Sequence, residues 1–125
     1  MASITILGKE FPIEYTVQVM EQITKKFGGT AEAVERMESG EDQLHDTIFM
    51  LAEMMKGAEK RERVKCALWG EEFKGTPALT YEQLLEIMNP EDLRNMADAL
   101  VEAINASSKQ TTQVYPDNKK KEVMT

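Results

Sequence analysis

The sequence predicts a mainly helical fold: an N-terminal β-hairpin over about residues 3–15, then five or six short-to-medium helices in a single compact domain, then a disordered C-terminal tail. Residues 3–15 alternate apolar and polar side chains, residues 16–105 place apolar side chains every three or four positions, and residues 107–125 show neither pattern. A chain of 125 residues, 42% of them hydrophobic, supplies one core. We therefore expect one domain over residues 1–106 and a flexible polar, basic tail over residues 107–125.

The hairpin is predicted from two alternating runs, residues 3–7 and 10–15, which the turn-forming pair Gly8-Lys9 separates. Pro12 has no N–H to donate, so its strand is expected at a sheet edge or at a bulge. Two strands alone are only marginally stable in water. The hairpin is therefore expected to lie against helices.

The hydrophobic pattern takes on helical spacing at Thr16. Gly28-Gly29 tolerates the left-handed conformation that commonly ends a helix, so a first helix is predicted over residues 16–27. Thr30 is predicted to cap a short second helix, which Ser39-Gly40 ends. The side chains expected to face inward are Thr16, Met20, Ile23 and Phe27 in the first helix, and Ala31, Val34 and Met37 in the second.

A third helix is predicted over about residues 42–56, with Gly57 as its end. Residues 58–69 are predicted to form a separate helix, charged in its first half and apolar in its second. The third helix carries one apolar stripe at helical spacing. The residues of this stripe are Leu44, Ile48, Leu51, Ala52 and Met55.

Two more helices are predicted from their start signals. Residues 70–78 form the loop before them, and Thr80 opens a capping box for a short helix. Asn89-Pro90 is the second start signal, and residues 106–108 end the helical pattern. The side chains expected to face inward are Leu84, Leu85, Ile87 and Met88 in the short helix, and Leu93, Met96, Ala97, Leu100 and Ile104 in the last.

Residues with reactive side chains are few. The chain has one cysteine, Cys66, and one histidine, His45, so alone it builds neither a disulfide nor a zinc site of Cys and His ligands. Apolar neighbours favour a buried structural role for Cys66, and His45 lacks a nucleophile turn near it in sequence. We therefore predict a protein that is not an enzyme, with no catalytic residue, cofactor or metal.

The charge of the chain is acidic overall. The net charge is −7, and because residues 107–125 carry +2, the rest of the chain carries −9. An acidic surface repels a phosphate backbone.

The sequence contains no run of about 18 apolar residues and no leader-peptide pattern. We expect a soluble interaction protein, with no direct nucleic-acid binding and no membrane contact.

Methionine is the most distinctive feature of the composition, with nine residues. Thioether side chains either fill irregular gaps in a core or form adaptable surfaces for partners, and both interpretations stay open. On the third helix, Met50 and Met54 form a second stripe about 100° from the first, and Phe49 lies off its other side. So broad an apolar arc indicates either a central helix or an intermolecular contact. Phe49, Met50 and Met54 are therefore the candidate protein-binding residues.

Two blocks of the sequence resemble a known family. Residues 4–13, Ile-Thr-Ile-Leu-Gly-Lys-Glu-Phe-Pro-Ile, lead into a helix that ends Lys26-Phe27-Gly28-Gly29. Residues 79–93 run Leu-Thr-Tyr-Glu-Gln-Leu-Leu-Glu-Ile-Met-Asn-Pro-Glu-Asp-Leu. This order of segments is similar to that of the tail assembly chaperones of siphophages and prophages of Gram-positive bacteria, over roughly residues 4–105.

The resemblance implies a non-enzymatic assembly factor in the bacterial host cytoplasm. Members of that family hold the tape measure protein in soluble form, help to recruit tail tube subunits around it, and leave before the virion is complete. The partners it implies are the tape measure protein and the tail tube protein, and a homo-oligomer is left open. The alternative is a small acidic regulatory protein of a mobile element that binds a basic protein surface by mimicking nucleic acid.

Overall fold

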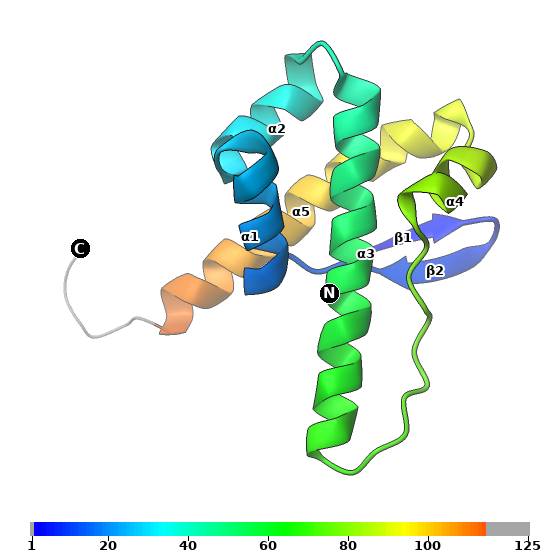
Figure 1. Cartoon of the computed structure of the whole chain (residues 1–125), viewed down its shortest axis with the longest axis vertical. Helices are drawn as coiled ribbons and strands as arrows, with labels where there is room; N and C mark the ends of the chain where they lie inside the picture. Colours follow the sequence, from blue (N-terminus) through cyan, green and yellow to red (C-terminus); the bar gives the residue numbers. More distant parts are fainter. Residues whose placement is uncertain (1, 115–125) are drawn as a thin grey trace.

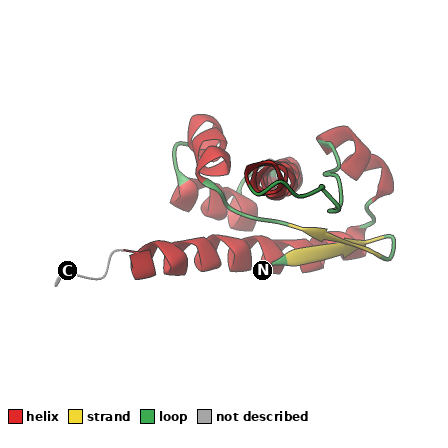
Figure 2. Cartoon of the chain, turned by 90° about the horizontal axis from the view of Figure 1, so that it is seen from below, coloured by secondary structure: helices red, strands yellow, loops and turns green. Residues whose placement is uncertain are grey.

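The computed structural model describes residues 2–114 of the chain. Within them the fold is mainly helical, with an N-terminal antiparallel hairpin and five helices, which confirms the predicted fold class. The hairpin and the last helix form one layer, and the other helices lie on it (Figure 1, Figure 2). None of the described helices is both long enough and apolar enough to cross a membrane.

The hairpin consists of β1 (Ser3–Ile6) and β2 (Lys9–Pro12), with Ile4 opposite Phe11. Its turn is Leu7-Gly8, one position before the predicted pair, and both turn residues have positive φ, 53° and 78°. Such a turn matches the right-handed twist of the two strands. Ile4 and Phe11 are buried, β1 packs on the last helix and β2 on α3, so the hairpin lies against helices as expected.

The first helix, α1 (Val17–Phe27), has the predicted start and end. The Thr16 Oγ1 accepts a hydrogen bond from the N–H of Val19 (3.2 Å), and Gly28 ends the helix with φ 99°. The prediction that Met20 faces inward is wrong, because the helix turns Val19 toward the core and leaves Met20 43% exposed. The buried side chains of α1 are Val19, Ile23 and Phe27.

The second helix, α2 (Thr30–Ser39), is capped by Gly29, so the predicted cap at Thr30 is wrong. The Thr30 hydroxyl is hydrogen-bonded to the hydroxyl of Tyr15, in the segment before α1, and makes no capping bond. Ala31, expected to face inward, is exposed, and the buried side chains of α2 are Ala33 and Met37.

The third helix, α3 (Gln43–Leu68), is one continuous helix of 26 residues. The predicted end at Gly57 and the separate helix over residues 58–69 are therefore wrong. A glycine inside a helix costs about 1 kcal/mol relative to alanine, but it removes a side chain where another helix must approach. A Cβ built on Gly57 would lie 2.4 Å from the Val19 Cγ2. This glycine thus serves the contact between α1 and α3.

The two C-terminal helices, α4 (Tyr81–Ile87) and α5 (Pro90–Val114), both begin as predicted. The Thr80 Oγ1 accepts from the N–H of Gln83 (3.1 Å), and the Gln83 Oε1 accepts from the N–H of Thr80 (2.9 Å). At the start of α5 the side chains and backbone N–H groups of Asn89 and Asp92 bond in the same reciprocal way, each at 3.0 Å. These caps satisfy N–H groups that a helix start leaves free.

The end of α5 differs from the prediction. The helix continues to Val114, so the domain boundary predicted at residue 107 falls inside it. Residues 107–114 contain no glycine or proline that would stop a helix, and the next proline is Pro116. The rest of the predicted tail, residues 115–125, lies outside the described residues.

The core surrounds the first half of α3, which packs against α1, α2, α4, α5 and β2 (Figure 2). Because α3 has neighbours on several sides, its broad apolar arc is covered within one chain. Leu44 and Leu85, expected inward, are exposed by 55% and 49%. The methionines buried to 4% or less are Met37, Met50, Met54, Met55 and Met96.

Candidate functional site

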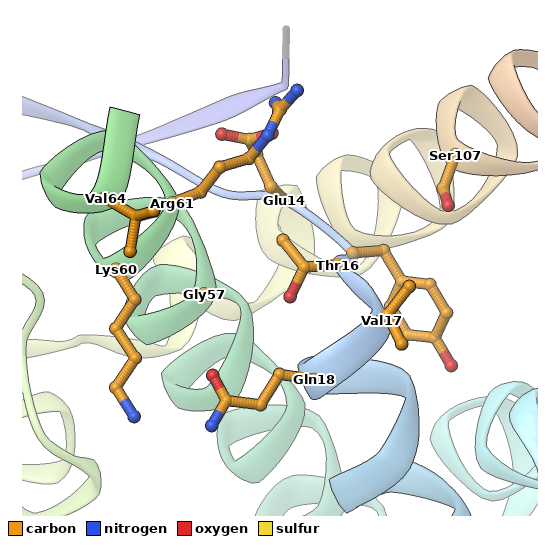
Figure 3. Close-up of a pocket in the computed structure, with 10 residues that line it drawn as sticks. Glu14, Thr16, Val17, Gln18, Gly57, Lys60, Arg61, Val64 and Ser107 are labelled. Carbon is orange, nitrogen blue, oxygen red and sulfur yellow. The ribbon is translucent and has the colours of Figure 1, made fainter. Parts of the chain in front are cut away.

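A groove of about 600 Å³ opens between the N-terminus of α1, the second half of α3 and the part of α5 near Ser107. We call it the α1–α3 groove. In Figure 3, side chains of α3 and of the start of α1 stand on opposite walls, with Ser107 on a third side. The residues that line it are Glu14, Tyr15, Thr16, Val17, Gln18, Gly57, Lys60, Arg61, Val64 and Ser107.

The segment before α1 is bound directly to α3. The N–H of Glu14 donates to the carbonyl of Met54 (3.2 Å), and the Glu14 carboxylate forms an ion pair with Arg61. A Cβ on Gly57 would lie 3.3 Å from the Glu14 carbonyl oxygen and 3.3 Å from the Thr16 Oγ1. Gly57, labelled on α3 in Figure 3, therefore lets the two walls of the groove approach each other.

Two aliphatic side chains are exposed on the walls of this groove. Val17, the first residue of α1, is 79% exposed, and Val64 of α3 is 58% exposed. Leu68, one turn further along α3, is 74% exposed and continues the same face. Single exposed apolar residues are ordinary, but Val17 and Val64 both line one hollow, which is typical of a contact surface.

The rim of the groove carries positive charge. Lys60 is exposed and makes no ion pair with any residue in the described part of the chain, and Arg61 is paired with Glu14. A local basic rim stands out on a chain with a net charge of −7. It would favour a partner with an acidic group beside an apolar surface.

The opposite face of the second half of α3 is covered by the loop over residues 69–80. The Glu59 carboxylate accepts from the N–H of Ala78 (2.7 Å) and from the Arg63 Nε (2.6 Å). These two donors, the Ala78 N–H first, lower the pKa of Glu59. The Arg63 guanidinium lies 4.0 Å from the centre of the Phe73 ring. The groove is thus on the side of this half-helix that the loop leaves open.

Cys66 faces the loop and is buried, as predicted. Removal from water, and then the negative charge of Glu62, raise the pKa of its thiol, so less thiolate forms at a given pH than in the unfolded chain.

We expect native Cys66 to react with a disulfide reagent at pH 8 much more slowly than the denatured chain does. The absorbance of the thiol that the reagent releases measures the rate. Equal rates in the two states would contradict a buried thiol.

The candidate protein-binding residues Phe49, Met50 and Met54 do not form a surface. Met50 and Met54 are both 0% exposed in the core, so their prediction as exposed contact residues is corrected. Phe49 is half-buried, with its ring edge-on to that of Phe27 at 6.0 Å and the Lys26 Nζ 4.9 Å from its centre. The apolar arc of α3 is broad because this helix lies at the centre of the fold. The alternative interpretation of the pattern, a central helix, therefore applies.

His45 lies beside Tyr81 and Asp46. The ring of His45 lies 5.2 Å from that of Tyr81, and its Nδ1 is 3.3 Å from the Asp46 Oδ1. Among the described residues, no three His, Cys, Asp or Glu side chains come together in a way that could hold a metal.

The groove residues Val17, Lys60 and Val64 were not singled out from the sequence. The spacing of Lys60, Val64 and Leu68, four residues apart, marks one helix face, but its exposure depends on where α1 begins. Comparison of the chain with protein-family models, curated proteins and solved structures finds no match.

Proposed function

We propose that this chain is a non-enzymatic phage tail assembly chaperone that uses the α1–α3 groove to hold a helical segment of the tape measure protein. The observation that carries the proposal is the uncovered face of α3 in this groove, where Val64 and Val17 are exposed beside Lys60. The resemblance of residues 4–13 and 79–93 to tail assembly chaperones supports the same class of function.

The chemistry of the groove suits an amphipathic helix. Aliphatic side chains of a client would pack on Val17 and Val64, and an acidic side chain beside them would meet Lys60. A client helix covered in this way no longer exposes its apolar stripe to other chains, and the acidic body keeps the complex dispersed. Recruitment of tail tube subunits, action in the host cytoplasm, absence from the mature virion and any homo-oligomer belong to the same proposal.

The experiment is co-expression of the chain with the tape measure protein that the proposal assigns to it, with soluble and co-purified client as the readout. We expect Val64→Asp to reduce the recovered complex at least about tenfold, because it places a carboxylate in the apolar wall of the contact. The matched control is Leu85→Asp, a similarly exposed aliphatic residue on α4 outside the groove, which should leave recovery unchanged.

Two outcomes contradict the proposal. If the client stays insoluble with the native chain, the chaperone function fails, and a basic protein partner of an acidic regulator should be sought instead. If the client is solubilised equally by both variants, the chaperone function stands and the groove is not its binding site. Circular dichroism spectra of both variants separate a lost contact from a lost fold.

A further inference from the structure

A second cavity lies at the other end of α3, at the corner where α2 ends and α3 begins. It measures about 420 Å³ and is separate from the α1–α3 groove, about 20 Å away along the helix axis. Four of its lining side chains are acidic and one is basic. The lining residues are Glu35, Arg36, Ser39, Gly40, Glu41, Asp42 and Asp46.

Asp46 distinguishes this cavity from an ordinary acidic surface. Its side chain is only 4% exposed, whereas carboxylates are rarely buried without a partner. The Oδ1 lies 3.3 Å from the His45 Nδ1, but the Oδ2 is buried and has no hydrogen-bond partner among the described residues. A buried acceptor without a donor is costly, so each such atom calls for an explanation.

The side-chain donors of Gln43 and Thr47 are engaged elsewhere. The side-chain amide of Gln43 donates to the carbonyls of Met37 and Glu38, in the last turn of α2. The Thr47 hydroxyl donates to the carbonyl of Gln43 (2.7 Å). The chain therefore closes the α2–α3 corner with its own donors and leaves the Asp46 Oδ2 without one.

Arg36 is the one basic side chain in the cavity wall. Its guanidinium lies 5.7 Å from the centre of the Phe27 ring and forms no ion pair with the residues that the structure describes. A single arginine also cannot balance the charge of four carboxylates. The cavity keeps a negative excess that a further cation would neutralise.

We infer that the α2–α3 cavity binds an arginine side chain of a partner protein, with the guanidinium donating to the Asp46 carboxylate. A guanidinium carries several N–H donors on one planar group, so it can satisfy a buried carboxylate oxygen and a carboxylate of the rim together. A metal ion fits less well, because no three acidic or histidine side chains of the described residues converge on one point. This inference does not depend on the chaperone function or on the groove.

The test is a titration of the full chain with N-acetyl-argininamide, followed by proton–nitrogen correlation NMR. We expect saturable shifts of the amide signals of Ser39, Gly40 and Asp46. The neutral analogue N-acetyl-citrullinamide, which has nearly the same shape, should not produce them. Asp46→Asn should weaken binding at least about tenfold, since it removes the charge that the guanidinium meets. Glu38→Gln, an exposed acid on α2 outside the cavity, is the matched control and should bind as the native chain does.

Several results would overturn the inference. Equal shifts with the citrulline analogue would show that charge is not recognised, and no shifts at all would show that the cavity does not bind a guanidinium. Unchanged binding by a folded Asp46→Asn variant would exclude the carboxylate as the ligand. The variant Arg36→Gln provides a further check, with no arginine probe added. If this substitution shifts the carbon NMR signal of the Asp46 carboxyl group, the chain's own Arg36 already occupies the cavity.

Discussion

Replacing Met54 by alanine is expected to lower the free energy of unfolding by about 2–5 kcal/mol, the range for large-to-small changes at a fully buried position. Met54 is 0% exposed, and its side chain belongs to the cluster that α3 shares with its neighbours. Alanine is an excellent helix former and keeps the carbonyl that Glu14 binds, so the loss is one of packing alone. Urea denaturation followed by circular dichroism measures it.

Met20→Ala is the matched control for this experiment. Met20 has the same side chain on a neighbouring helix but is 43% exposed, so the same change should alter stability by less than about 1 kcal/mol. A difference between the two variants therefore reports burial rather than the chemistry of methionine. Equal and small losses would mean that Met54 lies at a surface, which was one of the two interpretations of the α3 pattern.

Gly57→Leu is expected to destabilise the fold by roughly 3 kcal/mol or more, even though leucine favours a helix over glycine. A Cβ at this position already lies 2.4 Å from the Val19 Cγ2, and Val19 is a buried, branched side chain that has no free end to move aside. The start of α1 must therefore separate from α3, which also opens the α1–α3 groove. Thermal and urea denaturation measure the loss of stability.

Ala67→Leu is the control for Gly57→Leu, because Ala67 is exposed on the same helix. We expect it to leave stability within about 0.5 kcal/mol of the native value, as most surface changes do. If Gly57→Leu were as stable as the native chain, α1 would not pack on α3 at this point. Gly57→Ala should give a smaller loss than Gly57→Leu, because alanine adds only the Cβ while gaining similar helix propensity.

These two experiments separate the roles of α3's two halves. The first half is buried on several sides and carries the methionines, so substitutions there act on folding. The second half has one face under the loop of residues 69–80 and one face open in the groove, so Val64→Asp is expected to change an exposed surface and to leave the core intact. A binding study that changed Met50 or Met54 would have measured unfolding instead.

The caps at the starts of α1, α4 and α5 could be predicted from the sequence because they are local. Thr80 and Gln83 lie three residues apart and bond to each other's backbone, and Asn89 and Asp92 do the same. The left-handed conformation at Gly28 is likewise a property of one residue. None of these contacts requires a segment far away in the chain.

The candidate sites could not be predicted in the same way. The face of Lys60, Val64 and Leu68 was visible as a spacing, but whether another helix covers it depends on α1, about forty residues earlier in the chain. Asp46 gave no signal at all, because a carboxylate in the first turn of a helix is common and its burial comes from the corner with α2.

The sequence by itself determined the class of the fold, the hairpin, the start of most helices and the scarcity of reactive side chains, since spacing and capping residues act over a few positions. Only the tertiary structure decided that Gly57 lies in a helix–helix contact, that Met50 and Met54 are core residues, and that Val64 and Asp46 line hollows. The physical reason is the same in each case. Burial and close approach are set by neighbours from distant parts of the chain, and a periodic pattern records only that a face is apolar, not what covers it.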